Sequence, residues 1–476
     1  MLRYNFKYES ILLFRSKWIQ VLIGILIMLF GFATYNGQQK TQKRKADIEK
    51  VTAEIRTSDQ NMLKLLDSVE HGLTVTARPW TIPNTPMAVG NYHPRVASKP
   101  PSELSFLATG QSDMFTHFVK PTVRGDDLAL NFSEMTSPVQ LLFGSFDLAF
   151  VIIFLLPLLI IAFSYDVLSS ERESGSLRLL AAQPILLYKW LMQKLALRFF
   201  WLAAITTATV LLVFLANQVP VSNNFSAILS FLGISLTYVL FWFALAFAVN
   251  LWAESSAKNA VALLGLWVVF VLLIPSILNQ LGSTLYPIPS RALMVNEMRT
   301  IKAEATERQD VILDNYLRNH PEYAVNDTTQ ERSFWHSYMA SQNLIKKELE
   351  PVLSKYENQL QKQQQLLDHF TWLSPAILVQ RSMNQLADNG SESYEGYRNR
   401  VIVFAGEWRD HFLPMLYNNQ AFSSEDYGQL PEFTYTPINN QSQSSVLVIL
   451  LCSGLVVLGV GALRFYVSSD EKHSII

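Results

Sequence analysis

The longest charge-free stretch of the chain, residues 199–253, reads FFWLAAITTATVLLVFLANQVPVSNNFSAILSFLGISLTYVLFWFALAFAVNLWA. It is too long for one crossing of a hydrocarbon core of about 30 Å, which takes a helix of about 20 residues. A polar turn at residues 217–224, which contains Pro220, divides the stretch into two parts. We therefore expect two membrane-spanning helices here, at residues 199–216 and 228–252.

The composition favours a membrane protein and excludes several other classes. Of 476 residues, 50% are hydrophobic and 16% are charged, whereas soluble proteins carry roughly 25% charged residues. A formal net charge of -1 gives no basic face of the kind that binding to nucleic acid requires. The single cysteine, Cys452, excludes an intrachain disulfide and a thiolate metal cluster. We expect membrane lipid, and no nucleic acid, among the partners.

Further apolar blocks of spanning length lie at residues 18–35, 147–165, 261–278 and 446–465. The first block ends in Ala33-Thr34-Tyr35, which is a poor cleavage site for a signal peptide. We therefore interpret it as an uncleaved helix. The fold class that the sequence predicts is an α-helical polytopic membrane protein with six transmembrane helices.

Lysine and arginine in the short loops predict the orientation in the membrane. There are four in residues 1–17, five in residues 166–198 and one, Lys258, between the fourth and fifth spans, but none in the 217–224 turn. Positive residues collect in cytoplasmic loops. The amino terminus is therefore expected in the cytoplasm, and an even number of spans places the 466–476 tail there as well.

More than half of the chain then lies outside the membrane, as two extracytoplasmic domains at residues 36–146 and 279–445. The basic run at residues 40–45 points the other way, yet long segments cross the membrane largely regardless of charge. Apolar residues of the first domain recur at near-helical spacing from Ile48 to Val69, and the chain becomes Pro-rich after Gly72. We expect a helix followed by irregular loops with short strands.

The second domain is expected to be mainly helical. Apolar residues recur at helical spacing from Met294 to Tyr316, before Pro321, and again from Ile345 to Phe370 across a predicted kink at Pro351. Ser374-Pro375 supplies a cap and a first-turn proline for another helix toward Leu386. These stripes fit either a helical core or a docking face for an extracytoplasmic protein partner, and both interpretations stay open.

A motif lies between the second and third spans, where residues 166–184 read DVLSSERESGSLRLLAAQP. Gly175 permits a break after the membrane helix, Ser176 can cap a new short helix, and Pro184 prevents that helix from continuing. The result is a stub of about two turns. A helix this short is not stable alone, so it needs a surface on which to dock.

This motif resembles the signature of type-2 ABC transporter permeases. The resemblance is carried by the Glu-x-Glu-x-Gly-Ser-Leu run from Glu171, by Gln183-Pro184 and by Lys194 at the start of the third span. Residues 1–17 are similar to the amphipathic connecting helix of that family. The resemblance implies that the stub is a coupling helix seated in a cytoplasmic ATPase subunit. It assigns ATPase coupling to Glu171, Arg172, Glu173, Ser174, Gly175, Ser176, Leu177 and Arg178.

The two large domains resemble those of a bacterial subgroup of these permeases. Residues 107–113, 144–150 and 373–376 carry this similarity. It implies a multi-pass protein of the bacterial inner membrane that works with a second permease chain, identical or related. Within the first of these segments, Gln111, Ser112 and Asp113 are a candidate family-signature turn, and an ordinary capped turn is the alternative.

Three residues of the spans allow both a structural and a functional interpretation. Asp147 is expected at the outer membrane boundary, where a carboxylate costs little, and a substrate or gating role is the alternative. Pro157 and Pro275 are expected to kink their spans rather than to bind a ligand.

The sequence lacks the motifs of several enzymes. There is no Gly-x-x-x-x-Gly-Lys-Ser/Thr phosphate loop, no Gly-x-Ser-x-Gly elbow and no His-x-x-x-His pair among eight histidines. We therefore expect no catalytic residue, no metal site and no cofactor in this chain. ATP and Mg would be bound by the partner ATPase.

Three functions are open from the sequence. The first is the permease subunit of an ABC exporter. The second keeps the ATPase but replaces transport with mechanical work on an extracytoplasmic partner, such as lipoprotein, secretion or motility machinery. The third is a membrane-anchored sensor or scaffold without an ATPase, which gives no reason for a capped stub.

Overall fold

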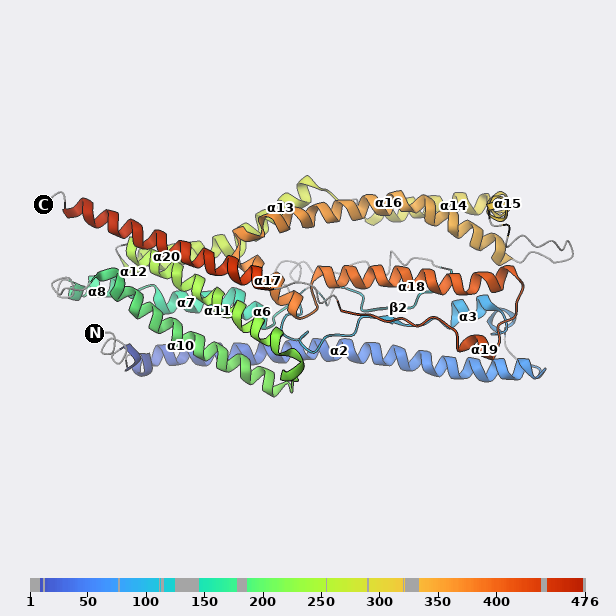
Figure 1. The fold of residues 1–476 in the computed structure, drawn as a ribbon, viewed down its shortest axis with the longest axis horizontal. Helices are drawn as coiled ribbons and strands as arrows, with labels where there is room; N and C mark the ends of the chain where they lie inside the picture. Colours follow the sequence, from blue (N-terminus) through green and yellow to red (C-terminus); the bar gives the residue numbers. More distant parts are fainter. Residues whose placement is uncertain are drawn as a thin grey trace.

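The protein is an elongated, mostly helical molecule (Figure 1). Long apolar helices occupy one end, and layers of helices and loops occupy the other (Figure 1). The computed structural model describes all residues except 1–8, 12, 76–77, 111, 113–114, 125–144, 178–185, 254, 289–290, 320, 322–333, 438–442 and 474–476.

Among the described residues, six helical segments are long and apolar enough to cross a membrane. They are Lys17–Glu70, Leu148–Glu173, Leu187–Ala216, Val221–Trp252, Ser256–Leu285 and Ser444–Leu463. The predicted fold class, an α-helical polytopic membrane protein, is confirmed. The sides of the membrane on which the two large domains lie stay a prediction.

These segments form the membrane bundle, and their elements keep the labels of Figure 1. In chain order the bundle contains α2 (Lys17–Glu70), α6 (Leu148–Phe150), η3 (Val151–Leu155), α7 (Leu156–Ser164), α8 (Ser169–Glu173), α10 (Leu187–Ala216), α11 (Val221–Trp252), α12 (Ser256–Trp267), η4 (Val268–Leu273), α13 (Ile274–Leu285) and α20 (Ser444–His473). Helix α2 alone has 54 residues, a length of about 80 Å at 1.5 Å per residue. It therefore continues far beyond the bilayer.

Helix α11 forms the centre of the membrane bundle. Every residue from Phe241 to Leu251 is buried. Helix α20 packs along α11, and its glycines permit the close approach, because a Cβ added at Gly461 would lie 3.0 Å from the Cα of Ala248. Gly454 lies two turns earlier on the same face, beside Phe241. Small residues at such contacts let the backbones of membrane helices approach closely.

The fifth membrane-spanning segment, which contains α12, η4 and α13, widens into a π turn beside Pro275. In η4 the N–H of Ile274 donates to the carbonyl of Val269, five residues earlier, and Pro275 has no N–H for the carbonyl of Phe270. The Ser374 hydroxyl, from outside this helix, donates to that carbonyl at 2.6 Å. A polar group in a bilayer must find its partner within the protein, and here another segment supplies it.

A second π turn, η3, lies directly before Pro157. The Tyr238 hydroxyl of α11 donates to the carbonyl of Ile153 at 3.0 Å, and the Trp267 indole N–H donates to the carbonyl of Phe154 at 3.2 Å. The proline positions that the sequence marks as kinks are therefore places where neighbouring helices bond to the spanning helix.

The end of the molecule away from the membrane bundle is built on the far half of α2, and we name it the distal domain. Its core contains Met62 and Leu66 of α2 together with buried aromatic side chains such as Trp408 and Phe412. The Trp408 indole donates to the carbonyl of Gly90 at 3.0 Å. Its elements are η1 (Pro79–Thr81), α3 (Pro86–Tyr92), β1 (Ala97–Ser98), β2 (Phe118–Val119), α18 (Ser391–Tyr417) and α19 (Ser424–Tyr427), with β1 and β2 antiparallel.

A second layer lies beside α18 (Figure 1). It consists of α14 (Arg291–Glu307), α15 (Gln309–Asn319) and α16 (Phe334–Phe370), and η6 (Thr371–Leu373) and α17 (Pro375–Leu386) follow. Arg398 of α18 donates to Glu357 of α16 at 2.8 Å, and Tyr316 stacks on Tyr417. The predicted start of α17 is confirmed, because the Ser374 side chain accepts from the N–H of Ile377 with Pro375 in the first turn.

We predict that the close contact between α11 and α20 tolerates no larger residue. Gly461→Leu should destabilise the protein by about 1–3 kcal/mol, because the new side chain overlaps Ala248. Gly459→Leu is the matched control, since a Cβ at this exposed glycine meets nothing within 4 Å. The thermal unfolding midpoint of the purified protein measures both, and equal midpoints would contradict the packing argument.

Candidate functional site

The predicted coupling segment begins where the second membrane helix ends. Helix α7 ends at Ser164 and the short helix α8 covers Ser169–Glu173. Gly175 follows with φ +79°, a left-handed conformation that favours glycine, so the predicted break lies there. Ser176 and Leu177 are described, whereas Arg178 and the rest of the predicted stub fall in residues 178–185, outside the described part of the chain.

Glu173 joins this segment to the fifth membrane helix. Its carboxylate accepts from the backbone N–H of Ser256 at 2.7 Å and from the Ser256 hydroxyl at 3.0 Å. Ser256 is the first residue of α12. A carboxylate at a helix start satisfies a free N–H and interacts favourably with the helix dipole. Glu173 therefore connects the end of α8 directly to the start of α12.

Glu171 joins the same segment to the third membrane helix. It accepts from the Lys194 ammonium of α10 at 3.1 Å and also from the Ser176 hydroxyl. Lys194 lies 3.7 Å from Glu9, and Arg198 lies 2.9 Å from the same buried carboxylate. Lys194 of α10 thus links the coupling segment to the residues that precede α2, and Arg198 of the same helix bonds to Glu9 as well.

Two buried asparagines hold three membrane helices together beside this segment. Asn250 of α11 donates to the carbonyl of Ser164 at 2.8 Å and accepts from the N–H of Leu168 at 3.3 Å. Asn259 of α12 donates to the carbonyl of Tyr165 at 2.8 Å. Both are fully buried, and neither is among the site residues predicted from the sequence. The sequence feature that could have identified them is a single amide side chain in an otherwise apolar span, because polar residues inside membrane spans often have a function.

Asp147 lies at the opposite end of the second membrane helix and is 1% exposed. One carboxylate oxygen accepts from the N–H of Phe150 at 2.9 Å and caps α6. The other accepts from the N–H of Thr109 at 2.8 Å, its hydroxyl at 3.0 Å and the N–H of Gly110 at 3.2 Å. This geometry gives Asp147 a structural role as a clamp, and a substrate or gating role stays a prediction.

The clamp belongs to a junction between the membrane bundle and the distal domain. Of the candidate signature turn, Gln111 and Asp113 lie outside the described residues, and the buried Ser112 hydroxyl donates to the carbonyl of Thr109. The neighbouring turn at Phe106 packs so closely on α2 that a Cβ at Gly37 would overlap its carbonyl oxygen.

A buried ion pair, Lys99 with Asp388, extends this junction. The Lys99 ammonium donates to the backbone carbonyl of Asp388 at 2.7 Å as well as to its carboxylate. Burial lowers the pKa of Lys99, although the Asp388 carboxylate opposes this shift. Next to it, the Asn389 amide donates to the carbonyl of Ala108 at 2.8 Å. Residues 387–390 are thereby fixed to the turn that Asp147 holds.

The described residues contain no group of three or more His, Cys, Asp or Glu side chains that could hold a metal ion. The two polar regions at the ends of the second membrane helix are built instead from hydrogen bonds and ion pairs. Such contacts can position helices relative to one another.

We predict that Asp147 stabilises the fold. Asp147→Ala should lower the free energy of unfolding by roughly 3 kcal/mol, because it leaves buried N–H groups without an acceptor. Asp147→Asn should cost less, since the amide keeps one acceptor oxygen. Asp410→Asn, on the exposed surface of α18, is the control. A variant with unchanged thermal unfolding but lost activity in vesicles would favour the gating role.

Comparisons with known proteins give two matches. Residues 291–436 match the family model of a domain of unknown function, DUF3526. The chain is also 34% identical over 125 residues to the probable ABC transporter permease protein NosY of Pseudomonas aeruginosa. That match covers 25% of this chain and 46% of the relative, so it spans less than half of the relative's length. No solved structure matches the chain. The similarity to an ABC transporter permease supports, over this part of the chain, the resemblance that its sequence carries.

Proposed function

We propose that this chain is the permease subunit of a type-2 ABC transporter that exports its substrate. A separate cytoplasmic ATPase would bind ATP and Mg, and two permease chains would form the transporter. The similarity to a permease and the membrane-length helices support this proposal. The observation that carries it is the double attachment of the coupling segment, by Glu171 to α10 and by Glu173 to α12.

In this proposal the ATPases act on the chain through the coupling segment. When the ATPases close on ATP, they push residues 176–182. Glu173 passes the displacement to the start of α12, and Glu171 passes it to α10 through Lys194. Such coupling requires that the two nucleotide states of the ATPase contact the coupling segment differently.

The buried asparagines determine which helices move together. Asn250 and Asn259 bond the end of α7 to α11 and α12. A push on the coupling segment would therefore tilt these helices as a unit. The proposal places both chain ends in the cytoplasm and the protein in a bacterial inner membrane, and it gives the chain no enzymatic activity of its own.

We predict that an ATPase with a phosphate loop co-purifies with this chain from its native membrane. Deletion of residues 176–182 should abolish this association, because it removes the docking stub. Glu171→Ala with Glu173→Ala should keep the association but reduce ATP hydrolysis in vesicles to the rate of the ATPase alone. Glu407→Ala is the control, because it removes an exposed ion pair with Arg400 that contributes at most about 1 kcal/mol.

Two results would contradict the proposal. Permease-stimulated ATP hydrolysis that is unchanged in the double variant would show that the two glutamates are not the coupling contacts. A chain that purifies from its native membrane without any ATPase would favour the sensor or scaffold interpretation.

A second candidate function, mechanical work on an extracytoplasmic partner, is favoured by the continuity of α2. This helix runs unbroken from the membrane bundle to the far end of the distal domain (Figure 1). There the Glu70 carboxylate accepts from the N–H and the hydroxyl of Ser424, both at 2.8 Å. A tilt of α2 in the membrane would therefore displace α19.

This candidate predicts that ATP moves the far end of α2. A fluorophore on a cysteine at the exposed Leu73, with the single native cysteine replaced by Cys452→Ser, should change its emission when ATP is added to the complex. Ala53→Pro should abolish the change, because proline breaks the helix, and Ala53→Ser is the matched control. An ATP response that survives Ala53→Pro would exclude α2 as the lever.

A further inference from the structure

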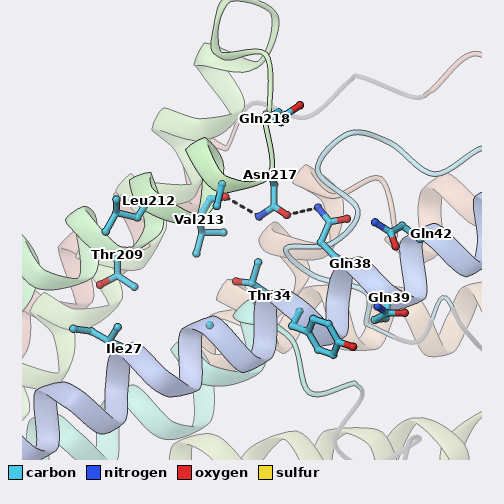
Figure 2. A pocket seen from close by; sticks show the side chains of 13 residues that line it. Ile27, Thr34, Gln38, Gln39, Gln42, Thr209, Leu212, Val213, Asn217 and Gln218 are labelled. Carbon is cyan, nitrogen blue, oxygen red and sulfur yellow. Dashed lines mark hydrogen bonds between the residues drawn. The ribbon is translucent and has the colours of Figure 1, made fainter.

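An open groove of about 660 Å³ lies between α2 and α10 (Figure 2). One end of the groove is bridged by a hydrogen bond in which the Gln38 amide donates to the Asn217 side chain at 2.6 Å. Ile27 and Thr209 lie toward the other end (Figure 2). The volume is within the range of roughly 300–1,000 Å³ that is typical of small-molecule sites.

The lining of the groove changes polarity along its length. Ile27, Gly31 and Leu212 line the apolar part. Side-chain amides line the other part, where Gln39, Gln42 and Gln218 are exposed. None of the described residues that line the groove is charged.

This change in polarity coincides with the expected membrane boundary. The apolar sequence of α2 ends near Tyr35, and that of α10 ends at Ala216, just before Asn217. Tyr35 lines the groove at this depth and is 63% exposed. Tyrosine is enriched where the hydrocarbon core meets the headgroups. The apolar part of the groove therefore faces acyl chains, and the amide part faces headgroups.

We propose that this groove binds one membrane phospholipid with a zwitterionic headgroup. One acyl chain lies between α2 and α10 over Gly31, and the headgroup lies among the glutamine side chains. Amide N–H groups donate to phosphate oxygens, and amide carbonyls accept from an ammonium group. Because the lining carries no positive charge, it offers no ion-pair partner for the net negative charge of an anionic headgroup.

Two observations favour a lipid over a helix of another protein chain. The polarity of the lining changes once, at the depth where the polarity of a phospholipid also changes. The groove also opens on an outer surface of the bundle, where Leu212 is 64% exposed and Ile27 is 49% exposed. The inference depends on the membrane fold alone, so its failure would leave the proposed coupling to an ATPase unaffected.

The test counts phospholipids that stay bound to the full-length protein. The protein is reconstituted in vesicles of equal phosphatidylethanolamine and phosphatidylglycerol, extracted in detergent and weighed intact by native mass spectrometry. The wild-type chain is expected to retain one phosphatidylethanolamine. Gly31→Phe should lose it because the ring fills the groove. Ile25→Phe is the matched control, since Ile25 lies on the same helix, is exposed and does not line the groove.

A second variant blocks the groove from its opposite wall. Leu212→Trp should also lose the lipid, which keeps the test valid if Gly31→Phe does not fold. Retention of phosphatidylethanolamine by both blocked variants would overturn the site. Equal retention of phosphatidylglycerol by the wild type would overturn the headgroup assignment. A photo-crosslinker at Ile27 that captures a second copy of the chain instead of lipid would also overturn the proposal.

Discussion

The structure depends on one constraint, which is that a polar group inside a bilayer must find its partner within the protein. The π turns before Pro157 and Pro275 show how the chain meets it. Each widens its helix, and hydroxyl or indole groups of other segments bond to the carbonyls of these turns. A carbonyl in each π turn thus accepts a hydrogen bond from another segment, which joins the two segments. The buried Asn250 and Asn259 meet the same requirement through carbonyls at the end of α7.

Polar contacts between elements concentrate at the two ends of the second membrane helix. This placement suits the proposed transmission of motion. At one end, Glu171 and Glu173 attach the coupling segment to α10 and α12. At the other end, Asp147 attaches the helix to the turn at Thr109, which the 387–390 segment also contacts. Between them the bundle is mainly apolar, and apolar contacts are not directional. In the proposed mechanism, the polar contacts at the ends would determine which elements move together.

Helix α2 joins the membrane bundle to the distal domain without a break, and it enters the core of that domain with Met62 and Leu66. By contrast, α13 ends at Leu285 before α14 begins at Arg291. A continuous helix carries a displacement over its whole length because its hydrogen bonds resist bending. The same architecture would suit both proposed functions, an exporter whose outer domains change posture and a machine that acts on an outer partner. The proposed lipid groove lies where α2 is expected to leave the bilayer.

The sequence by itself determined the membrane class and the six candidate spans, because hydropathy, helix breaks and proline effects depend on residues close together in the chain. It also located the cap at Ser374 and the break at Gly175 for this reason. Only the tertiary structure revealed that Glu173 bonds to Ser256, that Gly461 faces Ala248 and that Asp147 is saturated by hydrogen bonds. These partners are far apart in sequence, and their pairing depends on how the helices pack. The groove between α2 and α10 was invisible for the same reason, since each helix contributes only half of its lining.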